Sequence, residues 1–193
     1  MQCRCTSKLI REGSVTKPNQ FELRAVELDL NGDDADRAFE FYRTTSGFKT
    51  FGIQIFVDGM RLEPSASVDF MCLLDSVHGH LVERSATIFT CGCGHSGCAF
   101  IDDTVQVSYQ GGLVTWRYPS PLVTKNRTPE NPFGEDIAFR FLRSEMVTEC
   151  KKLIQFIRDA SGNDLTKCRV PVFDKPLSKL LGISRFKWAR RGM

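Results

Sequence analysis

The residues most able to do chemistry lie together in one short turn, Cys91-Gly92-Cys93-Gly94-His95-Ser96-Gly97-Cys98. The turn carries three thiols and one imidazole ring. Zinc takes four nitrogen or sulfur ligands in a tetrahedron, so a candidate ligand set is Cys91, Cys93, Cys98 and His95. The glycines between them allow backbone conformations that other residues avoid. This turn is therefore a candidate zinc site.

Other interpretations of the turn stay open at the level of sequence. Four ligands crowd a loop this short, so Cys3 or Cys5 is an alternative fourth ligand in place of His95. The thiols can also form a disulfide or take part in redox chemistry. A third interpretation is structural, with Cys91 and Cys98 packing as small apolar residues beneath a glycine turn. The cofactor prediction is accordingly none or zinc.

The rest of the sequence assembles no catalytic set. His78 and His80 could supply an acid, a base or a metal ligand, but a predicted helix end is where histidines hydrogen-bond free carbonyls. Asp102 and Asp103 have the setting of solvated turn residues. Cys93 paired with His95 or His78 lacks the third, orienting residue of a nucleophilic site. We predict no catalytic residues and favour a protein that is not an enzyme.

The C-terminal part of the chain is basic. Residues 163–193 hold eight basic and two acidic residues, a net charge of +6, and since the whole chain carries +3 the preceding part carries −3. Cations interleaved with aromatics can bind phosphates and stack bases. The candidate nucleic-acid residues are Arg185, Lys187, Trp188, Arg190 and Arg191.

A docked amphipathic helix explains the same tail, and we favour it. Leu177, Leu180, Leu181, Ile183 and Trp188 would pack on the body of the protein while the cations stay in water. The predicted organisation is a single α+β domain over residues 1–162 and a basic C-terminal extension over 163–193 docked on it.

Most of the chain has the apolar–polar alternation of strands. Asp58-Gly59 predicts a hairpin turn, because both residues tolerate positive φ, and Gln110-Gly111-Gly112 predicts a second. A proline-rich loop is expected over residues 119–132. The predicted strands cover residues 21–30, 38–42, 51–57, 60–62, 86–89, 104–109, 113–118 and 137–141.

Two segments have helical spacing of apolar residues. Ser65 is predicted to cap a helix that carries Val68 and Met71 and ends at Gly79. Ser144 is predicted to cap the longest helix, about residues 144–160. The fold class is α+β, a mainly antiparallel sheet with this long helix packed on it and a short C-terminal helical extension.

The order of these motifs resembles an uncharacterised family of bacterial proteins with a C-x-C-G-x-x-G-C turn, a hairpin ending in V-x-W and a later F-x-F strand before a helix. The matching residues are Cys91 to Cys98, Val114-Thr115-Trp116 and Phe139-Arg140-Phe141, within about residues 50–160. The resemblance implies a shared fold and a bacterial cytosolic origin, and it brings no established activity. It also implies that the thiols recur whereas the position of His95 varies.

The chain begins without the apolar stretch of a secretory signal and contains no apolar run long enough for a membrane span, so we expect a cytoplasmic protein without membrane contact. The leading prediction is a non-enzymatic module of immunity or regulatory type that binds another protein. The alternatives are a zinc- or thiol-based protein centred on Cys91 to Cys98, and nucleic-acid binding through the basic tail.

Overall fold

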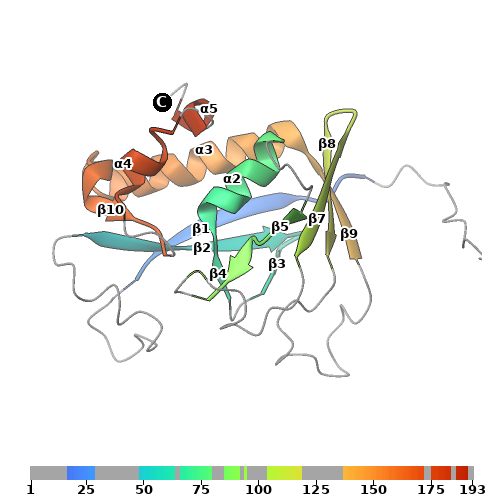
Figure 1. Cartoon of the computed structure of the whole chain (residues 1–193), viewed down its shortest axis with the longest axis horizontal. Helices are drawn as coiled ribbons and strands as arrows, with labels where there is room; N and C mark the ends of the chain where they lie inside the picture. The colour runs from blue at the N-terminus through green and yellow to red at the C-terminus, as the bar shows by residue number, and fades with distance from the viewer. Residues whose placement is uncertain are drawn as a thin grey trace, which may run out of the picture.

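The structure is a computed structural model, and it describes residues 17–28, 48–63, 66–79, 85–91, 94, 104–118, 137–171, 175–183 and 186–190. The predicted strand over 38–42 and the proline-rich loop over 119–132 lie outside these residues. The described part is an α+β fold with antiparallel sheets, as the sequence predicts (Figure 1).

One sheet is built around a long central strand. β2 (Lys49–Val57) pairs antiparallel with β1 (Phe21–Glu27) and with β3 (Met60–Arg61), and parallel with β10 (Cys168–Arg169). Asp58 and Gly59 form the tight turn between β2 and β3 at φ values of 50° and 81°. The predicted Asp-Gly hairpin is confirmed, because both residues take the positive φ that such a turn needs.

A second sheet is a four-stranded antiparallel unit. Its order is β5 (Ser85–Ala86), β7 (Val105–Gln110), β8 (Leu113–Tyr118) and β9 (Ile137–Leu142). Gly111 and Gly112 alone form the turn of the predicted second hairpin, because Gln110 still pairs with Leu113. The predicted strand over 86–89 is split, since β6 (Phe89–Thr90) leaves this sheet to pair with β4 (Ser67–Val68).

The first helix, α2 (Phe70–His78), begins later than the sequence suggests. Asp69, not Ser65, caps it, and the Asp69 carboxylate accepts hydrogen bonds from the backbone N–H groups of Met71 and Cys72, both at 2.9 Å. Val68, predicted to be helical, instead lies in β4. A carboxylate that satisfies two free N–H groups stabilises this start, and the strand pairing of Val68 with Phe89 excludes an earlier one.

The predicted long helix is α3 (Arg143–Ala160), which follows β9 directly. Ser144 is not its cap, because the helix begins at Arg143, whose backbone N–H donates to the Gly112 carbonyl oxygen at 2.9 Å. The side chain of the actual N-cap residue, Leu142, makes no capping hydrogen bond. Strand pairing that continues to Leu142 leaves no room for the expected serine cap.

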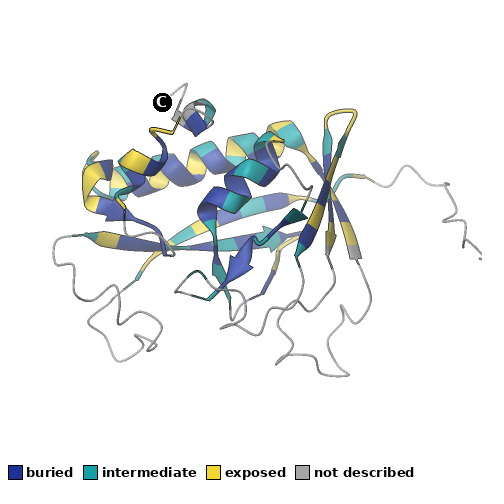
Figure 2. Cartoon of the chain, viewed as in Figure 1, coloured by how far each residue is buried: buried dark blue, intermediate teal, exposed yellow. Residues whose placement is uncertain are grey.

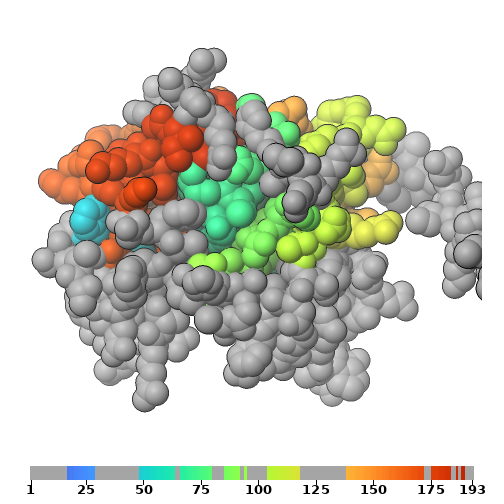
Figure 3. All heavy atoms as spheres, viewed as in Figure 1, coloured from blue at the N-terminus to red at the C-terminus, as the bar shows by residue number. Residues whose placement is uncertain are grey.

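The helices lie on one side of the sheet that contains β1 and β2, and their apolar faces enclose the core (Figures 1 and 2). Two short C-terminal helices, α4 (Leu177–Leu180) and α5 (Lys187–Arg190), complete this layer, and α5 contacts α3. Figure 3 shows α2 and the C-terminal segment together on one face of the molecule. Among the described helices, none has the length and hydropathy needed to cross a membrane.

Asn19 joins the two larger sheets. Its backbone N–H donates to the Arg140 carbonyl oxygen of β9 at 2.6 Å, and its side-chain Oδ1 accepts from the Arg140 N–H at 2.8 Å. Its Nδ2 donates to Asp58 at 2.7 Å. Asp58 also accepts from the backbone N–H of Gln20 at 2.7 Å. One asparagine thus ties the start of β1 both to β9 and to the turn after β2.

We predict that Asn19→Ala lowers the free energy of unfolding by about 1–2 kcal/mol, because it removes two side-chain hydrogen bonds and leaves the Arg140 N–H without that acceptor. The measurement is denaturation in guanidinium chloride followed by circular dichroism. The control is Gln155→Ala, which removes an amide that donates only to Asp159 on the surface of α3. We expect this control to change stability by less than about 0.5 kcal/mol; equal losses in both variants would contradict the role of Asn19.

Candidate functional site

The cysteine turn begins directly after β6. Gly94 donates its backbone N–H to the Cys91 carbonyl oxygen at 3.0 Å and has φ 86°, which shows why glycine suits this position. Cys91 is disulfide-bonded. Its partner lies outside the described residues, because none of the three other described cysteines is in a disulfide: Cys72, Cys150 and Cys168.

The disulfide bears on the predicted metal site. Zinc binds thiolates, so Cys91 can serve as a ligand only when the disulfide is reduced. The other predicted ligands, Cys93, Cys98, His95 and the alternatives Cys3 and Cys5, lie outside the described residues. Within the part of the chain that the structure describes, no group of three or more metal-binding side chains comes together. The zinc site stays a prediction.

The free thiols of the core are poorly suited to act as nucleophiles. Cys150 is fully buried on α3, and desolvation together with the nearby Glu149 charge raises the pKa of its thiol far above the usual range. Burial also raises the pKa of the Cys168 thiol. Because the thiolate is the reactive form, these two cysteines are structural.

The C-terminal segment packs against the body through most of its apolar residues, but Ile183, predicted to pack with them, is 42% exposed. Phe186 and Ala189 are fully buried, and the Trp188 ring stacks on the His78 ring with centroids 5.3 Å apart and planes inclined by 22°. The side chains of the predicted nucleic-acid cations Arg185, Lys187, Arg190 and Arg191 lie outside the described residues. Nucleic-acid binding by this tail stays a prediction.

His78 ends α2, as the sequence predicts. The Arg143 side chain holds this helix end, donating from Nε to the Val77 carbonyl oxygen at 3.0 Å and from Nη2 to the His78 carbonyl oxygen at 2.6 Å. Tyr109 adds a hydrogen bond from its hydroxyl to the Ser76 carbonyl oxygen at 2.7 Å. His80, Asp102 and Asp103 lie outside the described residues.

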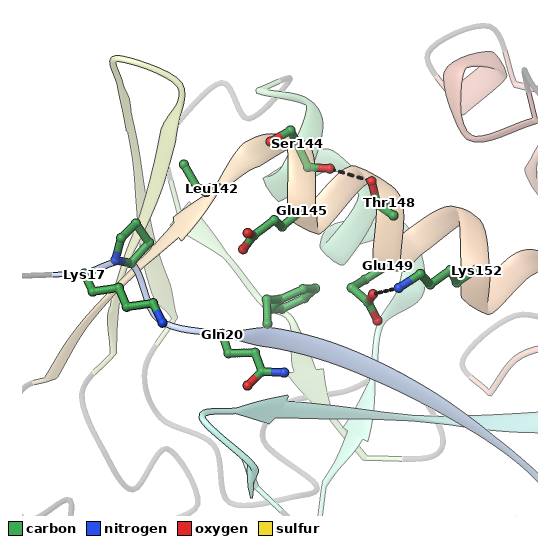
Figure 4. A pocket seen from close by; sticks show the side chains of 10 residues that line it. Lys17, Gln20, Leu142, Ser144, Glu145, Thr148, Glu149 and Lys152 are labelled. Carbon is green, nitrogen blue, oxygen red and sulfur yellow. Dashed lines mark hydrogen bonds and ion pairs between the residues drawn. The ribbon is translucent and has the colours of Figure 1, made fainter.

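A groove of about 500 Å³ runs between the start of β1 and the first half of α3 (Figure 4). We call it the β1–α3 groove. The strand side contributes the start of β1 and the residues before it, and the helix side contributes the first three turns of α3. The residues that line it are Lys17, Pro18, Gln20, Phe21, Leu142, Ser144, Glu145, Thr148, Glu149 and Lys152.

The edge of β1 that faces this groove is unpaired with any described strand. In an antiparallel pair, the main-chain N–H and C=O groups of alternate residues point toward the partner strand. The hydrogen bonds from Leu28 N–H to Thr50 and from Asp58 N–H to Gln20 show that in β1 these are the main-chain groups of the even-numbered residues. The main-chain groups of the odd-numbered residues therefore point to the other side. There, among the described residues, the one hydrogen bond made by a β1 backbone N–H runs from Leu23 to Glu149 Oε2, at 3.5 Å.

The helix side of the groove carries a stripe of mixed character. Glu149 accepts a hydrogen bond from Lys152 Nζ at 2.7 Å, which raises the pKa of that lysine. Glu145 lies exposed one turn earlier. Two apolar side chains flank these charges, Leu142 and, one turn beyond Lys152, Phe156, which are 38% and 53% exposed. The stripe thus has three charged residues between two apolar ones along one side of α3.

Sequence reasoning missed this groove. The helical spacing predicts a polar face on α3, but a polar face is ordinarily solvated. The Leu23–Glu149 contact joins residues 126 positions apart, and no local pattern indicates it. The sequence does contain one indication of a binding surface here: Phe156 is an apolar residue on the otherwise polar side of the helix.

We predict that iodoacetamide, at mildly alkaline pH, modifies Cys72 faster than Cys150 and Cys168, because Cys72 is only half-buried whereas the other two are inaccessible. Mass spectrometry of proteolytic peptides after short exposures measures the order. In guanidinium chloride the three rates should converge. Faster native modification of Cys150 would contradict its structural role.

Comparisons with protein-family models, with curated proteins and with solved structures find no match. The resemblance suggested by the cysteine turn therefore stays a prediction, and the β1–α3 groove is interpreted from its own geometry.

Proposed function

We propose that this protein is a non-enzymatic module that binds an extended segment of a partner protein in the β1–α3 groove. The observation that carries the proposal is the edge of β1 beside the groove, with which no described strand pairs. Unpaired main-chain donors and acceptors at alternate residues select an extended polypeptide, which adds a strand to the sheet. The predicted immunity or regulatory role and the cytoplasmic location belong to this proposal.

The dimensions of the groove suit a short strand. The seven residues of β1 span about 23 Å, and the eighteen residues of α3 span about 27 Å. They run in the same direction: Glu149, early in α3, meets Leu23, and at the far end Lys49 Nζ contacts both Glu27, at 3.3 Å, and the Ala160 carbonyl oxygen, at 3.0 Å. A segment of about seven residues fits this length.

The charges of the helix side indicate which segment would bind. Glu149 is already paired with Lys152, whereas the exposed Glu145 makes no ion pair with any described residue. A basic side chain on the incoming strand would pair with Glu145. Leu142 and Phe156 would receive apolar side chains on either side of it.

Glu149 has a second part in this proposal. Exposed strand edges invite non-specific pairing, and proteins protect them with charged side chains. The long contact from Leu23 to Glu149 occupies the middle of the β1 edge. A bound segment replaces this contact with main-chain hydrogen bonds, and Glu149 retains its pairing with Lys152. The Glu149 contact thus protects the β1 edge from non-specific pairing but can be displaced by a bound segment.

The test uses linear peptides selected on the full-length chain from a random phage-displayed library. We expect selected peptides to carry a basic residue between apolar ones, and methylation of their backbone nitrogens at alternate positions to weaken binding at least about tenfold. Methylation at the intervening positions should have little effect, because those N–H groups face away from β1. Isothermal titration calorimetry measures the affinities.

The protein variants locate the site. Glu145→Gln should weaken binding of the basic peptides several-fold, while Lys151→Gln, one residue before a groove residue but not lining the groove, should leave it unchanged. Failure to select any peptide would overturn the proposal. So would a methylation pattern without alternation, or equal effects of the two variants.

A further inference from the structure

We infer a second binding site, for a small aromatic carboxylate, in a separate cavity of about 640 Å³ on the other side of the start of α3. We call it the hairpin cavity, because the turn Gly111-Gly112 between β7 and β8 forms part of its rim. Its other walls come from the end of α2, the first turns of α3 and α5. Its volume lies within the range of small-molecule sites.

The walls of the hairpin cavity favour a flat, apolar body. His78 and Trp188 both line it, and their rings stack on each other, which places two aromatic rings at one wall. Leu142 and Val147 add aliphatic surface. The tryptophan is held in place by its neighbours, because Phe186 and Ala189 on either side of it are fully buried. A planar ring can pack against such a surface without reorganising it.

The charges of the cavity favour an anion. The described lining residues include Arg143 and Lys151 and no aspartate or glutamate. Lys151 makes no hydrogen bond or ion pair with any described residue. Arg143 uses Nε and Nη2 to hold the end of α2, and a guanidinium group with five N–H donors retains others. One lysine and a partly used arginine can together hold a single carboxylate.

Two further features of the lining agree with an anionic ligand. The N-terminal end of α3 has no side-chain cap, so its partial positive charge adds to that of Arg143 and Lys151. The Nε1 donor of Trp188 is shielded from solvent and has no hydrogen-bond partner among the described residues, so a small shift of the ring would let it donate to a bound carboxylate.

This site shares Leu142 and Ser144 with the proposed peptide groove, but the charged residues of the two sites differ. Lys151 and Lys152 are consecutive residues of α3, yet Lys151 lines the hairpin cavity and Lys152 lines the β1–α3 groove. Removing one positive charge at either position changes the net charge equally, and Lys152→Gln also removes the ion pair with Glu149. The two variants therefore form a matched pair that separates the two sites.

The probe is trans-cinnamate, a planar aromatic carboxylate, with neutral cinnamamide as its control of equal shape. Titration calorimetry with the full chain should show one cinnamate site, with cinnamamide binding at least about tenfold more weakly. Lys151→Gln should weaken cinnamate binding by about the same factor, whereas Lys152→Gln should leave it unchanged. Trp188→Phe should weaken both ligands, because it reduces the aromatic surface that they share.

Absence of cinnamate binding overturns the inference, as do equal affinities for acid and amide. Equal losses in Lys151→Gln and Lys152→Gln would place the ligand elsewhere and overturn it too. Tighter binding of inorganic phosphate than of cinnamate at the same site would refute the carboxylate assignment. If Trp188→Phe does not fold, the paired lysine variants and the paired ligands still decide the result. None of these measurements involves the peptide.

Discussion

The hydrogen bonds of Asn19 connect the two larger sheets. A single side-chain amide uses its oxygen to accept from Arg140 of β9 and its nitrogen to donate to Asp58 of the β2–β3 turn. No apolar residue could hold both partners, because one requires an acceptor and the other a donor. The two larger sheets are thereby joined at one point. Beyond it, β9 pairs with β8 and ends at Leu142, while β1 continues beside β2.

This junction explains where α3 lies. The rings of Phe21, Trp116 and Phe141 pack edge to face beside it, with centroids 5.2 to 5.7 Å apart, so β9 and β1 share a core but not a ladder. The chain leaves β9 directly into α3, whose buried stripe covers β1. The helix lies over the face of β1, and no described strand pairs with the β1 edge beside it.

Local signals in the sequence predict much of the fold. Alternation identified the strands later seen as β1, β2, β7, β8 and β9, and positive-φ residues identified both hairpin turns. Helix starts were predicted wrongly at Ser65 and Ser144, because several nearby residues can cap a helix and strand pairing decides among them. The contacts that form the groove could not be predicted, since they join residues more than a hundred positions apart. The cysteine turn, the most conspicuous motif in the sequence, contributes one disulfide-bonded residue to the described structure.

The β1–α3 groove, the hairpin cavity and the end of α2 all contact the start of α3. Arg143 holds the end of α2 and the backbone of Gly112, while Leu142 and Ser144 line both the groove and the hairpin cavity. The β1–α3 groove and the hairpin cavity differ in chemistry because successive helical residues point about 100° apart. The groove is therefore lined by Glu145, Glu149 and Lys152, and the cavity by Arg143, Val147 and Lys151. An occupant that shifts the first turn of α3 must alter a wall of both. Any coupling that results is reciprocal, since binding free energies at two linked sites change each other equally.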